Sequence, residues 1–318
     1  MIDKGTLLTV LAARIRRLGL VFAFLALCIV LSILSDRFLT LGNVLNILRQ
    51  SSINGIIAVG ITLVILTAGI DLSVGSVLAL GSVVTAQLLV SGIPPLVASL
   101  SGLLVGALLG LFNGTLVTLF SLPPFVATLG TMTFARGLAL SFTQGKPITG
   151  LPESFRILGT GFIGPIPVPV VIVLAVFLVG AIFLYLTPQG ERLYALGDNP
   201  VAARFTGIPV TSYVIMVYCI TGILAVLAGQ ILIARLDSAQ PVMGMGYEFN
   251  AIAAVVVGGA NFAGGRGGLL GTLIGVLLIV VINNGSNLLN IPSFWEQVVK
   301  GVVISMALLL NRASASKD

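Results

Sequence analysis

The sequence predicts an all-α membrane protein, a polytopic bundle of transmembrane helices that forms one domain over residues 1–318. Three observations support this fold class. Hydrophobic residues make up 57% of the chain and charged residues only 8%, whereas a soluble globular domain carries about 25% charged residues. The apolar residues form long runs, and a bilayer requires roughly 20 of them for each helical crossing. Gly, Pro, Asn and charged residues separate these runs.

Ten apolar runs predict about ten membrane spans. The first run, "LGLVFAFLALCIVLSIL", is longer than the core of a cleavable signal peptide and lacks a clear cleavage site, so we expect a retained span. In chain order the spans cover approximately residues 18–35, 50–69, 72–91, 95–119, 124–143, 166–187, 211–234, 249–264, 267–284 and 294–311.

The distribution of Lys and Arg predicts that both termini face the cytosol, because cytoplasmic loops hold the excess of positive charge. With ten spans, the inner side collects Lys4, Arg14, Arg16, Arg17, Arg192, Arg204, Arg266, Arg312 and Lys317. The outer side receives Arg37, Arg49, Lys146, Arg156 and Arg235, accompanied by Asp36, Glu153, Asp237, Glu248 and Glu296. The expected location is therefore a cytoplasmic membrane, crossed many times.

A faint internal duplication appears at an offset of 196 residues. It pairs Gly69 with Gly265, and it relates residues 36–119 to residues 235–311. The first four spans would then echo the last four. Transporters are often built from such repeats, with broken helices at corresponding positions.

The break between the second and third spans reads "TAGIDLSVGS". We expect Gly69 to end one helix in left-handed geometry. Asp71 then stands at an N-cap, where it could accept from the amides of Ser73 and Val74, with Gly75 in the next turn. The alternative is a proton- or ion-coupling carboxylate, since intramembrane acids are functional candidates. A turn near the cytosolic edge and the lack of a second buried acid favour the cap.

A second break, between the eighth and ninth spans, contains Gly264, Gly265 and Arg266. A phosphate-binding P-loop needs Lys after its last glycine, whereas here Gly265 follows Gly264. The chain is therefore not expected to hydrolyse ATP. Close approach of helices through small residues is the expected role of this segment.

Polar side chains within the spans are candidates for a translocation path. Amide groups could hydrogen-bond a polyol in transit, although they could equally tie helices together or cap them. Lys300 lies four residues after Glu296, an order that favours an ion pair. The candidates are Asn54, Asn250, Asn283, Asn284 and Lys300.

The longest charged loop on the inner side, "PQGERLYALGDNPVAARFTGIPV", predicts a short helix. Asn199 or Asp198 can cap it and Pro200 can occupy its first position. Ala202, Ala203 and Arg204 continue the helix, and Gly207 ends it. A helix of two turns is marginal alone in water. It must therefore dock, on a partner or on its own chain.

Several function classes are excluded or disfavoured. The chain has no histidine, which excludes His-ligated metals and His-based triads. No bound cofactor or metal is expected, and neither paired acids nor another catalytic constellation indicates an enzyme. The net charge of +6 is not clustered as a nucleic-acid interface would be.

The chain resembles the membrane permease subunits of bacterial ATP-binding-cassette importers for monosaccharides. The likeness covers nearly the whole chain. The stretches that carry it are "FLTLGNVLNILRQSSINGIIAVGITLVILTAGIDLSVGS", "PPFVATLGTM", "ERLYALGDNPVAARFTGI" and "GYEFNAIAAVVVGGANFAGGRGG". The family often has an acid at Asn250 and "TSL" in place of "ANF", which leaves the particular sugar open.

The resemblance implies inward transport of ribose or a related monosaccharide across the bacterial inner membrane. It also implies a second copy of the chain, two ATP-binding subunits that use the ATP, a soluble sugar-binding protein on the outer face, and membrane lipid as surroundings. The 199–207 helix would be the cytosolic coupling element. Alternatives are another aldose, a polyol or a furanose-like signal molecule as cargo, or an ion-coupled secondary transporter using Asp71.

Overall fold

The computed structural model describes residues 4–292, 295, 298, 301 and 302, with side-chain burial from residue 19 onward. Its helices are α1 (Lys4–Leu34), α2 (Leu41–Leu66), α3 (Val74–Val90), α4 (Pro95–Thr118), α5 (Pro124–Thr143), α6 (Glu153–Thr160), α7 (Val168–Leu186), α8 (Pro188–Asp198), α9 (Pro200–Phe205), α10 (Val210–Leu236), α11 (Tyr247–Val257) and α12 (Leu269–Leu288). Two-residue strands form two antiparallel pairs, β1 (Ile148–Thr149) with β4 (Ser238–Ala239) and β2 (Phe162–Ile163) with β3 (Ile166–Pro167).

The first nine predicted spans fall on helices, and the tenth, 294–311, together with Lys300, lies outside the described residues. Among the residues that the structure describes, six helices are long and apolar enough to cross a membrane: α2, α4, α5, α7, α10 and α12. The apolar part of α1 (Gly19–Leu34), α3 and α11 are shorter. An all-α polytopic membrane bundle is therefore confirmed, while the total of ten spans and the internal duplication stay predictions.

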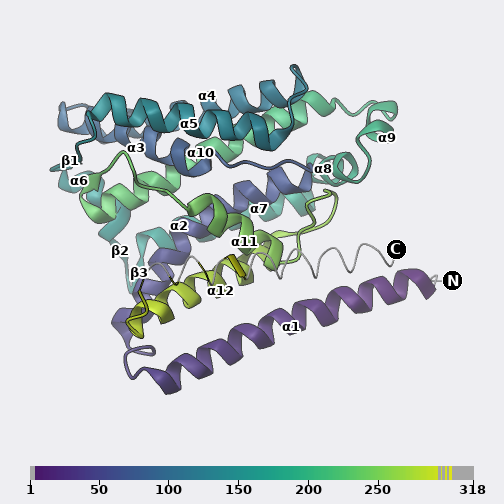
Figure 1. Ribbon diagram of the computed structural model, residues 1–318, viewed down its shortest axis with the longest axis horizontal. Coiled ribbons are helices and arrows are strands. Elements are labelled where there is room, and N and C mark those ends of the chain that lie inside the picture. Colours follow the sequence, from purple (N-terminus) through teal and green to yellow (C-terminus); the bar gives the residue numbers. More distant parts are fainter. Residues whose placement is uncertain (1–3, 293–294, 296–297, 299–300, 303–318) are drawn as a thin grey trace.

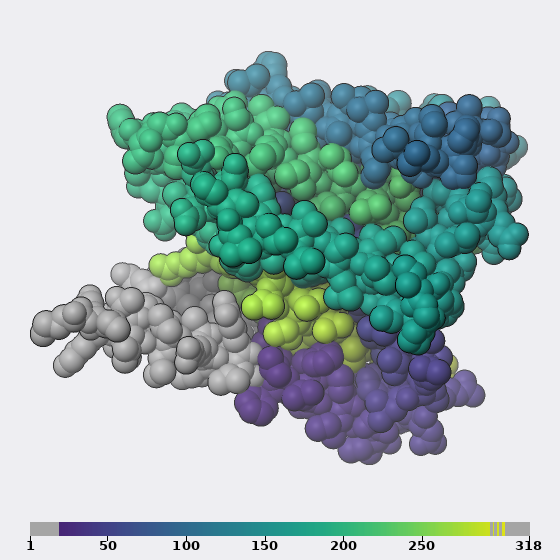
Figure 2. Space-filling model, turned by 180° about the vertical axis from the view of Figure 1, so that it is seen from behind, coloured from purple at the N-terminus to yellow at the C-terminus, as the bar shows by residue number. Residues whose placement is uncertain are grey.

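Helices α2 and α10 form the centre of the bundle (Figure 1). The most apolar windows of α2, α12 and α10 are 78%, 67% and 61% buried inside the protein, against 28% for α4 and α5 and 17% for α7. Helix α1 (purple) lies at one edge beside α12, as Figure 2 shows from behind. The peripheral helices expose large apolar side chains that suit a lipid surrounding.

Small residues let the central helices pack closely. A Cβ added to Gly106 of α4 would meet the carbonyl of Gly222 of α10, and a Cβ added to Gly222 would meet the carbonyl of Gly106. Gly258 and Gly271 make the same kind of contact between the end of α11 and α12. Without a hydrophobic driving force between helices in lipid, such close backbone approach supplies the packing energy. Gly258 and Gly271 lie on either side of the second break, so small residues bring α11 and α12 together there.

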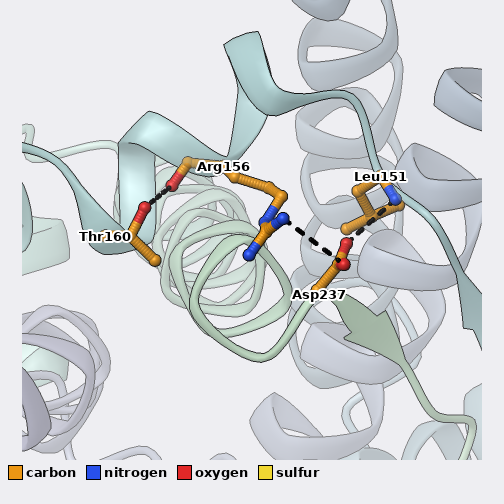
Figure 3. A network of polar contacts seen from close by, with 4 residues as sticks. All are labelled: Leu151, Arg156, Thr160 and Asp237. Carbon is orange, nitrogen blue, oxygen red and sulfur yellow. Dashed lines mark hydrogen bonds and ion pairs between the residues drawn. The ribbon is translucent and has the colours of Figure 1, made fainter.

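Helices α6 and α9 mark the two ends of the bundle, because α10 begins beside α9 and ends against α6. At the α6 end, Arg156 forms an ion pair with Asp237 at 3.6 Å, and the backbone N–H of Leu151 donates to the same carboxylate at 3.0 Å. Thr160 donates to the carbonyl of Arg156 at 2.9 Å (Figure 3). This network fastens α6 to the last turn of α10.

Candidate functional site

The short helix α9 forms as the sequence predicts. The side-chain oxygen of Asn199 accepts from the amides of Val201 and Ala202 at 3.1 and 2.9 Å, which identifies Asn199 rather than Asp198 as the cap. Pro200 occupies the first position, and Gly207 follows the last turn with a φ of +82°. The side-chain cap, the proline and the glycine, all within nine residues, are therefore enough to define α9.

The exposed face of α9 differs from the set of residues that the sequence suggested. Ala203 is buried and holds the helix on its own chain. Arg204 is exposed, and so are two large apolar residues that the sequence analysis missed, Val201 (62% exposed) and Phe205 (88% exposed). Residues four apart lie on one face of a helix, so α9 presents an apolar patch made of Val201 and Phe205. The four-residue spacing of Val201 and Phe205 was the feature of the sequence that could have predicted this patch.

A glycine junction connects α8 to two other elements at the α9 end. Gly197, near the end of α8, leaves no room for a Cβ, because the Leu66 carbonyl oxygen and the Gly265 amide nitrogen lie against it. The Gly265 amide donates to that Leu66 carbonyl at 3.0 Å. Gly264 and Gly265 have φ of +88° and +66°. These glycines lie in the non-helical segment between α11, which ends at Val257, and α12, which begins at Leu269. That segment is longer than the break that the sequence predicts.

Two tyrosines fasten the same junction to α12. The hydroxyl of Tyr194 in α8 donates to the Gly267 carbonyl at 3.0 Å. The hydroxyl of Tyr185 in α7 accepts from the amide of Leu269, the first residue of α12, at 2.9 Å. The backbone of Arg266 also takes part, since its carbonyl accepts from the amide of Asn261. Helix α8 is thus tied to the end of α2 and to the segment before α12, and α7 is tied to the start of α12.

The break around Asp71 corrects two expectations. Helix α2 ends at Leu66, and the left-handed residue is Ala68 (φ +58°), not Gly69. Gly69 is needed for space, because its Cβ would lie 2.8 Å from the Tyr218 hydroxyl. The Asp71 carboxylate accepts from the amide of Ser73 at 2.8 Å and from its hydroxyl at 2.6 Å. The predicted acceptance from the next amide was wrong, since Ser73 itself occupies the N-cap position of α3.

Asp71 also lies deeper than the expected edge. The Tyr218 hydroxyl donates to the Ile70 carbonyl at 3.3 Å, and Tyr218 is eight residues into α10, about 12 Å from its start. Asn113 of α4 donates to the Ser73 hydroxyl at 2.9 Å. With an exposed fraction of 2%, Asp71 is enclosed in a polar network that serves the start of α3.

The expectation that the chain has no second buried acid was wrong. Glu248, which the sequence placed among the outer loop charges, has an exposed fraction of 7%. One carboxylate oxygen accepts from the Gly246 amide at 3.1 Å. The other lies against Gly75 in the first turn of α3, where a Cβ would collide with it and with the Gly244 carbonyl, and it has no hydrogen-bond partner in the described part of the chain. Glu248 is buried by its contact with α3, which the sequence alone does not reveal.

The four described path candidates divide into two groups. Asn284 exchanges two hydrogen bonds with Asn43, at 2.8 and 3.0 Å, and so ties α12 to the start of α2. Asn54, Asn250 and Asn283 each carry a buried side-chain carbonyl oxygen without a hydrogen-bond partner among the described residues. They come from α2, α11 and α12, which pack on one another. Buried unpaired acceptors of this kind require an explanation, and a hydroxyl-rich solute would supply donors.

Comparison with known proteins identifies a family and relatives that match most of the chain. A family described as the branched-chain amino acid transport system / permease component matches residues 43–308. The ribose import permease protein RbsC of Bacillus subtilis (strain 168) is 49% identical over 303 residues, 95% of this chain and 94% of the relative. RbsC of Escherichia coli (strain K12) is 46% identical over 293 residues, 91% of each chain.

Another relative is named for a different sugar. The D-allose transport system permease protein AlsC of Escherichia coli (strain K12) is 41% identical over 285 residues, 88% of this chain and 86% of the relative. No solved structure matches the chain. The family match covers most of the chain, and full-length relatives exceed 40% identity. The chain therefore belongs to the permease-component family of ATP-binding-cassette transport systems, as a multi-pass protein of the inner membrane.

Proposed function

We propose that this chain is the permease subunit through which ribose or a related monosaccharide enters the bacterial cytoplasm, driven by ATP hydrolysis on a separate subunit. Ribose import permeases of three genera are 45–49% identical to it over nearly their whole length. The allose permease at 41% identity keeps other aldoses open as cargo. Two copies of the chain, two ATP-binding subunits and a soluble sugar-binding protein would complete the transporter.

The apolar patch of α9 is the observation that carries the proposal. A six-residue helix is unstable by itself in water, and here Asn199 and the buried Ala203 hold its shape while Phe205 stays 88% exposed. A large aromatic side chain that remains exposed on a rigid element suits docking into a groove of a partner. The partner would be the ATP-binding subunit, which places α9 on the cytosolic side.

The glycine junction would transmit movement of α9 into the bundle. Because Leu66, Gly197 and Gly265 touch through backbone atoms, α8 cannot shift alone without moving the end of α2 or the segment before α12. Packed elements respond to such displacements as rigid bodies. ATP-driven closure of the partner pair would thereby rearrange the helices that carry Asn54, Asn250 and Asn283. The sugar would meet weak hydroxyl acceptors, with most of the specificity supplied outside the membrane.

The decisive test is uptake in proteoliposomes that contain the chain with its ATP-binding subunit and the soluble sugar-binding protein. We expect uptake of labelled ribose that requires ATP and stops when residues 199–207 are deleted, although the protein still inserts. Competition with allose and other aldoses would define the cargo. Uphill transport by the chain alone, driven by a proton or sodium gradient, would refute the proposal and favour the secondary transporter.

A further inference from the structure

The connection between α10 and α11 reaches into the middle of the bundle. Residues 237–246 form no helix, and Asp237, Gly244 and Gly246 have φ of +54°, +75° and +84°. Gly244 touches Gly75 of α3 through backbone atoms, because a Cβ on either glycine would meet the carbonyl oxygen of the other. Gly75 lies fifteen residues before the end of α3, about 22 Å along the helix. The α10–α11 connection is thus non-helical backbone at membrane depth, where neighbouring protein must satisfy its polar groups.

Arg136 of α5 satisfies two of these groups. Its Nη1 donates to the carbonyls of Pro241 and Met243, at 2.6 and 2.7 Å. Arg136 is half-buried and is the thirteenth residue of its span. Both bonds use a single nitrogen of the guanidinium, and within the described residues its Nε and Nη2 make no hydrogen bond. Arg136 therefore holds the α10–α11 connection while most of the guanidinium stays available to another acceptor.

Glu248 lies near this arginine without touching it. The two side chains lie within electrostatic range of each other, yet in the part of the chain that the structure describes the one ion pair within 4 Å joins Arg156 to Asp237. The Oε1 atom of Glu248 accepts from the Gly246 amide, whereas its Oε2 lies against Gly75 without a hydrogen-bond partner. A buried carboxylate oxygen that lacks a donor raises the free energy of this arrangement.

The free donors of Arg136 and the unpaired oxygen of Glu248 are complementary. A planar guanidinium binds a carboxylate through two parallel hydrogen bonds. In this structure the two backbone carbonyls hold Arg136 instead. Forming the pair requires a shift between α5 and the start of α11, of the kind that packed helices make when a transporter changes conformation. Gly244 and Gly246 lie where such a shift would be absorbed, since glycine adopts both hands of backbone geometry.

We propose that Arg136 and Glu248 form a two-position clamp. In the conformation of this structure Arg136 holds the α10–α11 connection, and in the other main conformation of the transport cycle it binds the Glu248 carboxylate. The inference rests on the proposed function for the existence of that cycle and adds the residue pair that balances its two ends. Each conformation satisfies groups that the other leaves unpaired, so both positions are stable. Neither residue needs to touch the sugar.

The test compares the unfolding temperature with uptake kinetics in proteoliposomes that contain the complete transporter. Glu248→Gln removes a buried charge that has no ion pair in this structure, so the unfolding temperature is expected to stay unchanged or rise. The maximal uptake rate is expected to fall about tenfold at unchanged KM, because the second position of the clamp loses its ion pair. Glu153→Gln neutralises an exposed acid of α6 and is the matched control, expected to behave as wild type.

A double-mutant cycle tests whether the two residues act together. Arg136→Gln should lower the unfolding temperature, because it weakens the hold on Pro241 and Met243, and should lower the maximal uptake rate about tenfold or more. Adding Glu248→Gln to this variant should cost little further uptake, since the ion pair is already lost. Arg136→Lys keeps the charge but loses the fork, so intermediate uptake is expected. It replaces Arg136→Gln in the cycle if that variant fails to insert.

Each other outcome overturns the proposal. Losses that multiply in the double variant mean that the two residues act independently. A raised KM with a normal maximal rate in Glu248→Gln means that this acid contacts the sugar instead. Equal drops in unfolding temperature for Glu248→Gln and Arg136→Gln mean that the pair already exists in this conformation. Normal uptake in both variants refutes the clamp alone, whereas a wild-type transporter that takes up no sugar with its partners refutes the proposed function.

Discussion

Gly197→Ala is expected to uncouple ATP hydrolysis from transport, because it introduces one methyl group into the glycine junction. In an isolated helix this change would be favourable by ~1 kcal/mol. In the folded protein the new Cβ would lie inside van der Waals distance of the Leu66 oxygen and the Gly265 nitrogen, whereas carbon atoms pack best about 3.5–4 Å apart. Both neighbours are backbone atoms, so no side-chain rotation can make room.

The expected size of the effect follows from these opposing terms. Overpacking a closed site costs about 1–3 kcal/mol, and a collision with two backbone atoms belongs at the upper end of that range. After the gain in helix propensity, about 2 kcal/mol remains, which shifts the balance between docked and displaced α8 by roughly 30-fold. Displacement would relieve the collision, so the protein should still insert and bind its ATP-binding subunit.

The assay compares ribose uptake with ATP hydrolysis in the same proteoliposomes. We expect Gly197→Ala to keep most of the ATPase activity while uptake per ATP falls about tenfold or more. Gly137→Ala in α5 is the matched control, since nothing lies within 4 Å of its added Cβ. Normal uptake per ATP in Gly197→Ala, together with an unchanged unfolding temperature, would refute transmission through the junction.

Further predictions concern the cap, the docking patch and the asparagines. Asp71→Asn should retain an acceptor for the Ser73 amide and lower the free energy of unfolding by about 1 kcal/mol. Asp71→Leu leaves that buried amide unpaired and should lower it by about 3 kcal/mol. Equal and complete loss of uptake in both variants, at normal stability, would favour an ion-coupling role. Phe205→Ser should weaken association with the ATP-binding subunit about tenfold or more without changing the unfolding temperature, because the side chain is exposed. Asn284→Leu should destabilise the protein by about 1–3 kcal/mol, because it removes the hydrogen-bond partner of Asn43. Asn283→Leu should leave stability unchanged or raised and increase the KM for sugar uptake. The reverse ranking in thermal unfolding would contradict the assignment of the two asparagines.

Features governed by local chain chemistry were predictable. The Asn-Pro pair at 199–200 and Gly207 define α9, because a side-chain cap, a fixed proline φ and a left-handed residue act within a few positions. The apolar runs likewise predicted the positions of the described helices, six of which are long and apolar enough to cross a bilayer. The family motifs then indicated the transport class, which the comparisons bear out.

The roles of individual buried residues could not be predicted in this way. Sequence reading assigned the left-handed turn to Gly69, but the structure places it at Ala68 and uses Gly69 to admit Tyr218. Glu248 looked like a loop charge and is buried against α3. Nothing local distinguished Asn283 from Asn284, although one is unpaired and the other bonds to Asn43.

The sequence by itself determined that this protein is surrounded by lipid, where its apolar helices lie along the chain, and the short helix that projects from them. Only the tertiary structure decided which glycines meet, how deep Asp71 lies and which polar groups remain unpaired. The physical reason is that lipid is as apolar as a helix neighbour. In water, hydrophobic periodicity marks the face of a helix that turns inward, whereas in this chain apolar residues suit both faces. The contacts between spans must therefore be seen in three dimensions.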